Sequence, residues 1–119
     1  MYGLPQNIDL SFLKERKLES VCFAAYQVNL HFDNGAMISI FGTFRHFIIG
    51  EDSAGKTAQF PLSSSNLMRL LTQTVTKVQS QADGTLELAF SNNDTLVIYD
   101  DTKQYESYHI KNGERLIIV

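Results

Sequence analysis

Tryptophan is absent from this 119-residue chain, and cysteine occurs only once, at Cys22. A lone cysteine cannot form an internal disulfide, so the fold must depend on its own hydrophobic core. Lysine and arginine are dispersed and the net charge is -3, which argues against nucleic acid as a partner. No apolar run approaches the roughly 20 residues of a membrane-spanning helix, and the N-terminus lacks the layout of a signal peptide. We therefore expect one cytoplasmic domain over residues 1–119 that binds no membrane, metal or cofactor.

An internal repeat is the clearest positive feature of the sequence. The pattern of residues 29–41 recurs at residues 87–99, with most letters changed. The matching pairs are Leu30 and Leu88, Phe32 and Phe90, Asn34 and Asn92, Ile38 and Leu96, Ile40 and Ile98, and Phe41 and Tyr99. Each copy is an apolar alternation, a turn and a second alternation, which specifies a β-hairpin. We expect two equivalent hairpins whose phenylalanines face a shared interior.

The flanking residues extend each hairpin to a three-stranded meander, with strand patterns beginning at Leu18 and Val75. Cap residues at 63–66 followed by an apolar face predict one clear helix near residues 64–73. Asp9 predicts a short helical turn near the N-terminus. The predicted fold is α+β but mainly β: a curved antiparallel sheet or split barrel of about eight strands, made of two pseudo-repeated meanders.

Residues 37–49 form a long apolar segment that is hydrophobic on both faces, with Gly42 inside it. The glycine indicates a bulge or bend. Such a strand is either central and covered on both sides, or partly exposed at an interface. The second case predicts a homodimer through residues 37–49.

Residues 50–57 read Gly-Glu-Asp-Ser-Ala-Gly-Lys-Thr and fit the P-loop pattern, with Lys56 and Thr57 as the phosphate-binding pair. Three features argue against this interpretation. Pro61 interrupts the helix that the loop must open, Glu51 and Asp52 place negative charge where polyphosphate would lie, and the surrounding strands are linked by hairpins. Nucleotide binding at residues 50–57 ranks below the other interpretations.

The sequence contains no assembled catalytic or metal-binding constellation, so we assign no catalytic residue. A pairing of Cys22 with His46 and a carboxylate site at Asp100 and Asp101 both stay open. A small enzyme using His46 or Asp100 is therefore one alternative. A small-ligand binding protein that uses the concave face of the sheet is another, provided that core side chains do not fill that face.

Two acids followed by Tyr-Glu-Ser-Tyr make the most unusual segment, residues 100–108. In a strand, Tyr105 and Tyr108 project to opposite faces, so one is expected to pack on the core and the other to face outward. Tyrosine, acid and hydroxyl together are typical of a protein-contact surface. The predicted partner-binding residues are Tyr105, Glu106, Tyr108, Asp100 and Asp101. Alternatively, both tyrosines cover the core with their hydroxyls at its rim.

The chain resembles a small bacterial domain family of unassigned function. The resemblance is carried by Gln27-Val28-x-Leu30-x-Phe32-Asp33-x-Gly35, Thr85-Leu86-x-Leu88-x-Phe90 and the tail Tyr105-Glu106-Ser107-Tyr108. It spans nearly the whole chain, and the tail is its most specific part. It implies a cytosolic protein, in some members an immunity protein or an accessory partner of a toxin system, and it implies no catalytic residues. The leading functional interpretation is a non-catalytic domain that binds another protein.

Overall fold

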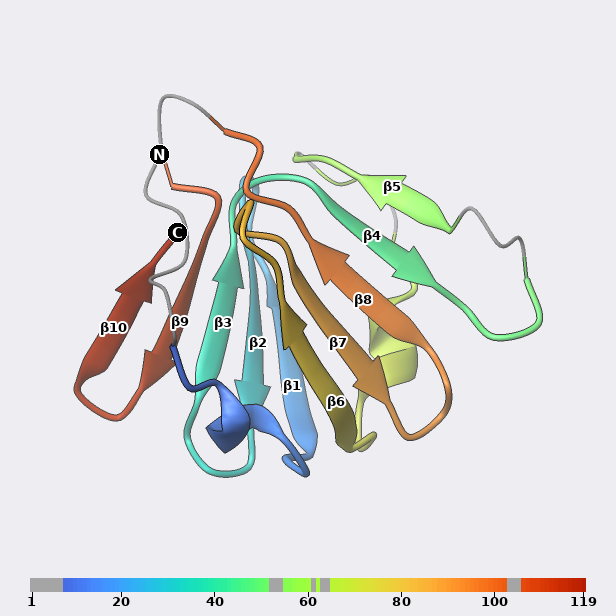
Figure 1. The fold of residues 1–119 in the computed structure, drawn as a ribbon. Helices are drawn as coiled ribbons and strands as arrows, with labels where there is room; N and C mark the ends of the chain where they lie inside the picture. Colours follow the sequence, from blue (N-terminus) through green and yellow to red (C-terminus); the bar gives the residue numbers. More distant parts are fainter. Residues whose placement is uncertain (1–7, 52–54, 61, 63–64, 103–105) are drawn as a thin grey trace.

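Two five-stranded antiparallel sheets enclose one hydrophobic core in the computed structural model, which describes residues 8–51, 55–60, 62, 65–102 and 106–119 (Figure 1). The first sheet contains, in order, β1 (Leu18–Phe23), β2 (Val28–Phe32), β3 (Met37–Ile40), β9 (Tyr108–Asn112) and β10 (Arg115–Ile118). The second contains β5 (Lys56–Ala58), β4 (Phe44–Phe47), β8 (Thr95–Ile98), β7 (Leu86–Phe90) and β6 (Val75–Ser80). Two 3-10 turns, η1 (Ser11–Leu13) and η2 (Leu67–Leu70), precede β1 and β6.

The predicted α+β fold with one clear helix near residues 64–73 is wrong, because the described part of this region, residues 65–73, contains only the four-residue 3-10 turn η2. Its buried residues, Leu67 and Leu70, are three apart, which matches the 3-10 repeat. Leu71 is already extended, and Thr72 has a left-handed φ of 67°. None of the helical turns described is long or apolar enough to cross a lipid bilayer.

The predicted single curved sheet or split barrel of about eight strands is also wrong, since the described residues form two separate sheets with ten strands and no closed barrel. The cause lies at Gly42. The segment 37–49, expected as one strand, divides there into β3 in the first sheet and β4 in the second. Both strands have neighbours on each side within their sheets, and the homodimer through residues 37–49 stays a prediction.

The two copies of the sequence repeat form hairpins with the same register. In β2 and β3, Val28 pairs with Ile40, and in β7 and β8, Leu86 pairs with Ile98. Burial alternates in the same way along β2 and β7, and β3 and β8 share a second pattern in which the first residue is half-buried and the next three are buried. We call residues 10–58 repeat 1 and residues 67–119 repeat 2.

The equivalence extends to backbone conformation outside the hairpins. Glu15 and Thr72, three residues before β1 and β6, have φ angles of 66° and 67°. The N–H of Glu15 donates to Val75 O, and the N–H of Thr72 donates to Leu18 O. Each repeat thus makes the same contact to the other, as an approximate two-fold relation requires.

After the third strand of each repeat, the chain crosses to the other sheet. The β4–β5 hairpin of repeat 1 pairs with β8 of repeat 2, and the β9–β10 hairpin of repeat 2 pairs with β3 of repeat 1 (Figure 1). Phe44 lies opposite Ile98, while Tyr108 lies opposite Ile40, so Phe44 and Tyr108 occupy equivalent places. Each sheet is therefore completed by the terminal hairpin of the other repeat, an arrangement that we call the hairpin exchange.

The interior between the sheets is filled by side chains. Phe32, Phe90, Ile40 and Ile98 are all essentially inaccessible to solvent and belong to one core cluster. The concave face that a small ligand would need is thus occupied by the core.

Gly84, in the β6–β7 turn, tests how tightly this structure is packed. Its φ is +92°, and a Cβ there would lie 2.6 Å from Asp100 Oδ2. Gly35 is a matched control, because its φ is +84° but a Cβ there would meet nothing within 4 Å. Gly84→Ala should lower the free energy of unfolding in urea by about 3 kcal/mol, against about 1 kcal/mol for Gly35→Ala. Equal losses would contradict the packing of Asp100 on Gly84.

Candidate functional site

A surface groove of about 870 Å³ is lined by residues from the segments that pass between the sheets. Figure 1 shows β3 continuing into β4 at the top of the molecule. The walls of the groove combine aromatic side chains, carboxylates and a histidine from separate segments: Tyr26, Phe41, Phe60, Asp101, Glu106 and His109. Tyr26 comes from the β1–β2 turn, Phe41 follows β3, and His109 is in β9. The hairpin exchange assembles these segments, and we call this hollow the exchange groove.

Gly42 lines the exchange groove and packs closely on the segment that follows β8. A Cβ at residue 42 would lie 3.2 Å from Thr102 Cγ2 and 3.3 Å from Asp101 Oδ1, so a larger side chain would press on both residues. The equivalent residue of repeat 2 is Asp100, because Phe41 matches Tyr99. In repeat 2 that larger side chain packs onto Gly84.

In repeat 2 the turn residue Gly84 is small and the residue after β8, Asp100, is larger, whereas repeat 1 has the opposite order. Two residues before β2 stands Tyr26, where Gly84 stands two residues before β7. The large residue therefore comes from the β1–β2 turn and the small one, Gly42, from the end of β3. Tyr26 and Gly42 line the exchange groove at positions that hold Gly84 and Asp100 in repeat 2, so the groove departs from the two-fold relation of the scaffold.

His109 and Phe41 form one wall of the groove, with ring centroids 4.8 Å apart in an edge-to-face contact. Nε2 of His109 is 3.7 Å from Glu106 Oε1, beyond hydrogen-bonding distance. This nitrogen is buried and has no hydrogen-bond partner among the described residues. The wall thus carries an unsatisfied polar atom next to a carboxylate.

A hydrogen-bond network behind the groove fixes the crossing segments. The buried hydroxyl of Ser107 donates to Asp100 Oδ1 at 2.9 Å and contacts Thr102 Oγ1 at 2.8 Å. The carbonyl of Ser107 accepts from the N–H groups of Phe41 and Gly42. Asp100 therefore contacts Ser107 and Gly84 within the protein.

Tyr108 is wholly buried, and its hydroxyl donates to Gly84 O at 2.7 Å. Burial raises the pKa of Tyr108, and the nearby charges of Asp100 and Asp83 raise it further. The hydroxyl therefore stays protonated and serves as an internal donor.

The structure separates the predicted partner-binding residues into two groups. Asp101 and Glu106 line the exchange groove, whereas Asp100 and Tyr108 point inward, and Tyr105 lies outside the described residues. Sequence reasoning missed the aromatic walls formed by Tyr26, Phe41 and Phe60. These residues lie in three distant segments with no shared motif, so only the hairpin exchange brings them together.

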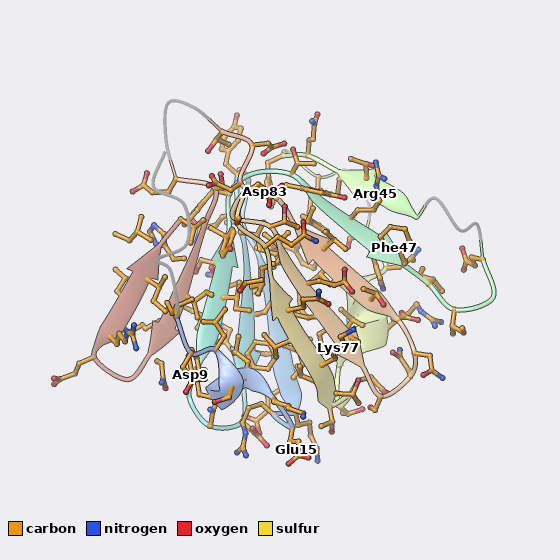
Figure 2. The ribbon with its side chains drawn as sticks, in the orientation of Figure 1. Asp9, Glu15, Arg45, Phe47, Lys77 and Asp83 are labelled. Carbon is orange, nitrogen blue, oxygen red and sulfur yellow. The ribbon has the colours of Figure 1, made fainter. Side chains whose placement is uncertain are left out.

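The P-loop pattern does not have P-loop geometry where the structure describes it, although residues 52–54 lie outside the described residues. Lys56–Ala58 form strand β5, antiparallel to β4, where a nucleotide-binding loop would begin a helix. Thr57 Oγ1 accepts a hydrogen bond of 2.9 Å from Arg45 Nε. Gly55 packs against the side chains of Arg45 and Phe47 on β4. Both residues are labelled in Figure 2.

A second polar cluster, which we call the ionic trio, consists of Asp94, His46 and Arg69. Asp94 is fully buried, His46 is buried, and Arg69 is partly exposed. Asp94 Oδ2 accepts from His46 Nε2 at 2.9 Å and from Arg69 Nε at 3.0 Å. Asp94 Oδ1 accepts from Arg69 Nη2 at 3.0 Å and from the N–H of Ile49 at 3.2 Å.

Burial alone would raise the pKa of Asp94. The hydrogen bonds from Arg69, His46 and the amide of Ile49 outweigh it and lower the pKa to about 2. Both oxygens of Asp94 and Nε2 of His46 are thus engaged within the protein and shielded from solvent. Cys22 is exposed on β1 in the other sheet, so the suggested Cys22–His46 pair is not assembled. Within the described residues, no group of His, Cys, Asp and Glu is arranged to hold a metal ion.

Comparison with known proteins gives one match. A model described as a family of unknown function (DUF6188) matches residues 10–119. The searches of curated proteins and of solved structures returned no match.

The ionic trio should make stability depend on pH through Asp94. Its pKa is lower in the folded state than the 3.8 of an ordinary aspartate. Asp94 therefore contributes about 2 kcal/mol to the free energy of unfolding above about pH 5, and this contribution is lost as the pH falls to about 2.

Asp94→Asn should lower stability at pH 6 and flatten the slope between pH 5 and pH 2, as measured by urea unfolding at a series of pH values. Glu19→Gln, an exposed change on β1, is the control and should keep the wild-type slope. An unchanged slope in Asp94→Asn would refute this assignment.

Proposed function

The chain belongs to DUF6188, a family of unknown function, and we propose that it is a non-catalytic domain that binds another protein through the exchange groove. An immunity protein or an accessory partner of a toxin system is the kind of protein that this proposal describes. The observation that carries it is the departure of the groove from the two-fold relation. The hairpin register and the hairpin exchange are duplicated in the two repeats, whereas at the groove a large and a small residue have changed places.

The composition of the groove supports a protein as the ligand. Tyrosine and phenylalanine are enriched in the centres of protein interfaces, where they bury a large area at low entropic cost. Tyr26 is 70% exposed, and Phe23, at the end of β1, is also exposed. Large aromatic side chains left in water at one end of a small domain are typical of an interaction site.

The alternatives have less support. The concave interior that a small ligand would occupy is filled by the core, and His46 is held by Asp94 away from solvent. The exchange groove opens to solvent and is bordered by exposed side chains, which suits a polypeptide segment.

Tyr26→Ser should reduce partner capture without affecting the fold, because exposed side chains contribute little to stability. Tagged wild-type and variant proteins, matched for folded content, would be incubated with a native lysate and the bound protein quantified. We expect a stoichiometric partner with wild type and at least a roughly tenfold loss with the variant, as for an aromatic hot spot.

Met68→Ser is the matched control. Met68 is 69% exposed, but it lies on η2, and none of the described groove residues belongs to that turn. This variant should capture the partner as wild type does. Undiminished capture by Tyr26→Ser, or no stoichiometric partner for the wild type, would count against the proposal.

A further inference from the structure

We infer that the exchange groove receives an arginine side chain of the partner. This inference rests on the proposed function and specifies the chemistry of the segment that binds. Among the described residues that line the groove, the ionisable side chains are Asp101, Glu106 and His109. None of the ion pairs among the described residues involves Asp101. The net charge of -3 favours a basic partner in the same sense.

The shape of the groove suits a long cationic side chain. Its aromatic residues, Tyr26, Phe41 and Phe60, offer surface for the methylene stem and ring faces for the charge. Asp101 and Glu106 are the acceptors for the charged head. A compact anion or a purely apolar side chain would leave these carboxylates without compensation.

The two carboxylates favour arginine over lysine. A guanidinium presents five N–H donors in a planar fork, whereas an ammonium is a compact charge with three. The fork binds a carboxylate through two parallel hydrogen bonds, so it can engage Asp101 or Glu106 in a way that an ammonium cannot.

The direct test uses a small probe, the peptide acetyl-Gly-Ser-Arg-Ser-Gly-amide, titrated into ¹⁵N-labelled protein and followed by NMR. Matched peptides carry citrulline, which keeps the shape without the charge, or lysine. We expect the arginine peptide to shift the amide signals of Phe41, Gly42 and His109 and to bind at least roughly fivefold more tightly than the citrulline peptide. Equal binding of arginine and citrulline would overturn the inference, and tighter binding of lysine would overturn the choice of arginine.

Asp101→Asn and Glu106→Gln should each weaken the arginine peptide several-fold, because each replaces a carboxylate by a neutral group of the same size. Glu19→Gln, which removes an exposed acid from β1, should leave binding unchanged. If the arginine peptide does not bind while Tyr26→Ser still abolishes partner capture, the protein-binding function stands and the arginine assignment fails.

A separate observation concerns the ionic trio, because the repeat equivalent of each of its three residues is apolar. Asp94 corresponds to Ala36, since each N–H bonds to the asparagine two residues earlier. His46, opposite Leu96, corresponds to Ile110, opposite Ile38.

Arg69 corresponds to Phe12, because each carbonyl accepts from the side-chain amide of an equivalent turn asparagine, Asn92 for Arg69 and Asn34 for Phe12. The buried pair Asp94 and His46 and the more exposed Arg69 therefore stand at positions whose repeat equivalents are alanine, isoleucine and phenylalanine.

We infer that the ionic trio selects the hairpin exchange over an unexchanged fold. Only three residues, 41–43, join β3 to β4, a length that also allows the two strands to fold back as an ordinary hairpin in one sheet. In that arrangement His46 would face the surroundings of Ala36, and Asp94 would face Ile110. His46 would be buried without its partner, and Asp94 would lose the hydrogen bonds from His46 and the N–H of Ile49 while keeping those from Arg69. Burying a polar group that has lost its partner is unfavourable.

The test uses a triple variant, Arg69→Phe, Asp94→Ala and His46→Ile, which gives each trio position the apolar residue of its repeat equivalent. We call these three residues the apolar set. Two disulfide reporters, built with Cys22→Ser, distinguish the pairings. Arg45→Cys with Val97→Cys joins β4 to β8, where these residues are opposite each other, and Arg45→Cys with Ser39→Cys joins β4 to its own β3. Directly opposed residues in antiparallel strands are close enough to be bridged.

With the trio intact, we expect only the 45–97 disulfide, and with the apolar set both disulfides, within or between chains. If the triple variant does not fold, the same disulfide test is made on the double variant His46→Ile with Asp94→Ala, which keeps the partly exposed Arg69. A folded variant of either kind that forms only the 45–97 disulfide would overturn the inference.

Discussion

Pairing of β4 with β8, together with the equivalent pairing of β9 with β3, is the constraint from which the other features follow. Without it, each repeat would be a five-stranded meander with its own edges. With it, the segments after β3 and β8 must cross at one end of the molecule, and their side chains meet there. The core, the exchange groove and the ionic trio all contain residues that only this crossing places together.

The sequence predicts the parts of this structure that depend on local pattern. The turns at Asn34 and Asn92 and the alternation on either side of them are set by neighbouring residues, so both hairpins can be inferred without coordinates. The prediction of a helix near residues 64–73 was wrong because the local pattern there fits two structures. Leu67 and Leu70 are compatible with an α-helix or a 3-10 turn, and tertiary pairing decides between them, because the chain must reach β6 at Val75.

Long-range choices could not be inferred in the same way. Gly42 was recognised as a bend, but whether the chain bends within a sheet or passes to another one depends on contacts with residues more than 50 positions away. Asp101 and Glu106 were found because acids near tyrosine stand out in the sequence. Tyr26 and Phe60 were missed because each is an ordinary aromatic residue within its own segment. The trio was missed because neither Asp94 nor His46 shows a spacing that marks an ion pair.

The hairpin exchange also has a consequence for how the protein comes apart. If one repeat unfolded alone, it would take two strands from the sheet of the other and leave core residues such as Phe90 exposed to water. Neither repeat is therefore a unit that opens independently, and the free energy of partial opening lies close to that of complete unfolding. The duplicated sequence could suggest two small domains, but the hairpin exchange makes the two repeats unfold together as one cooperative unit.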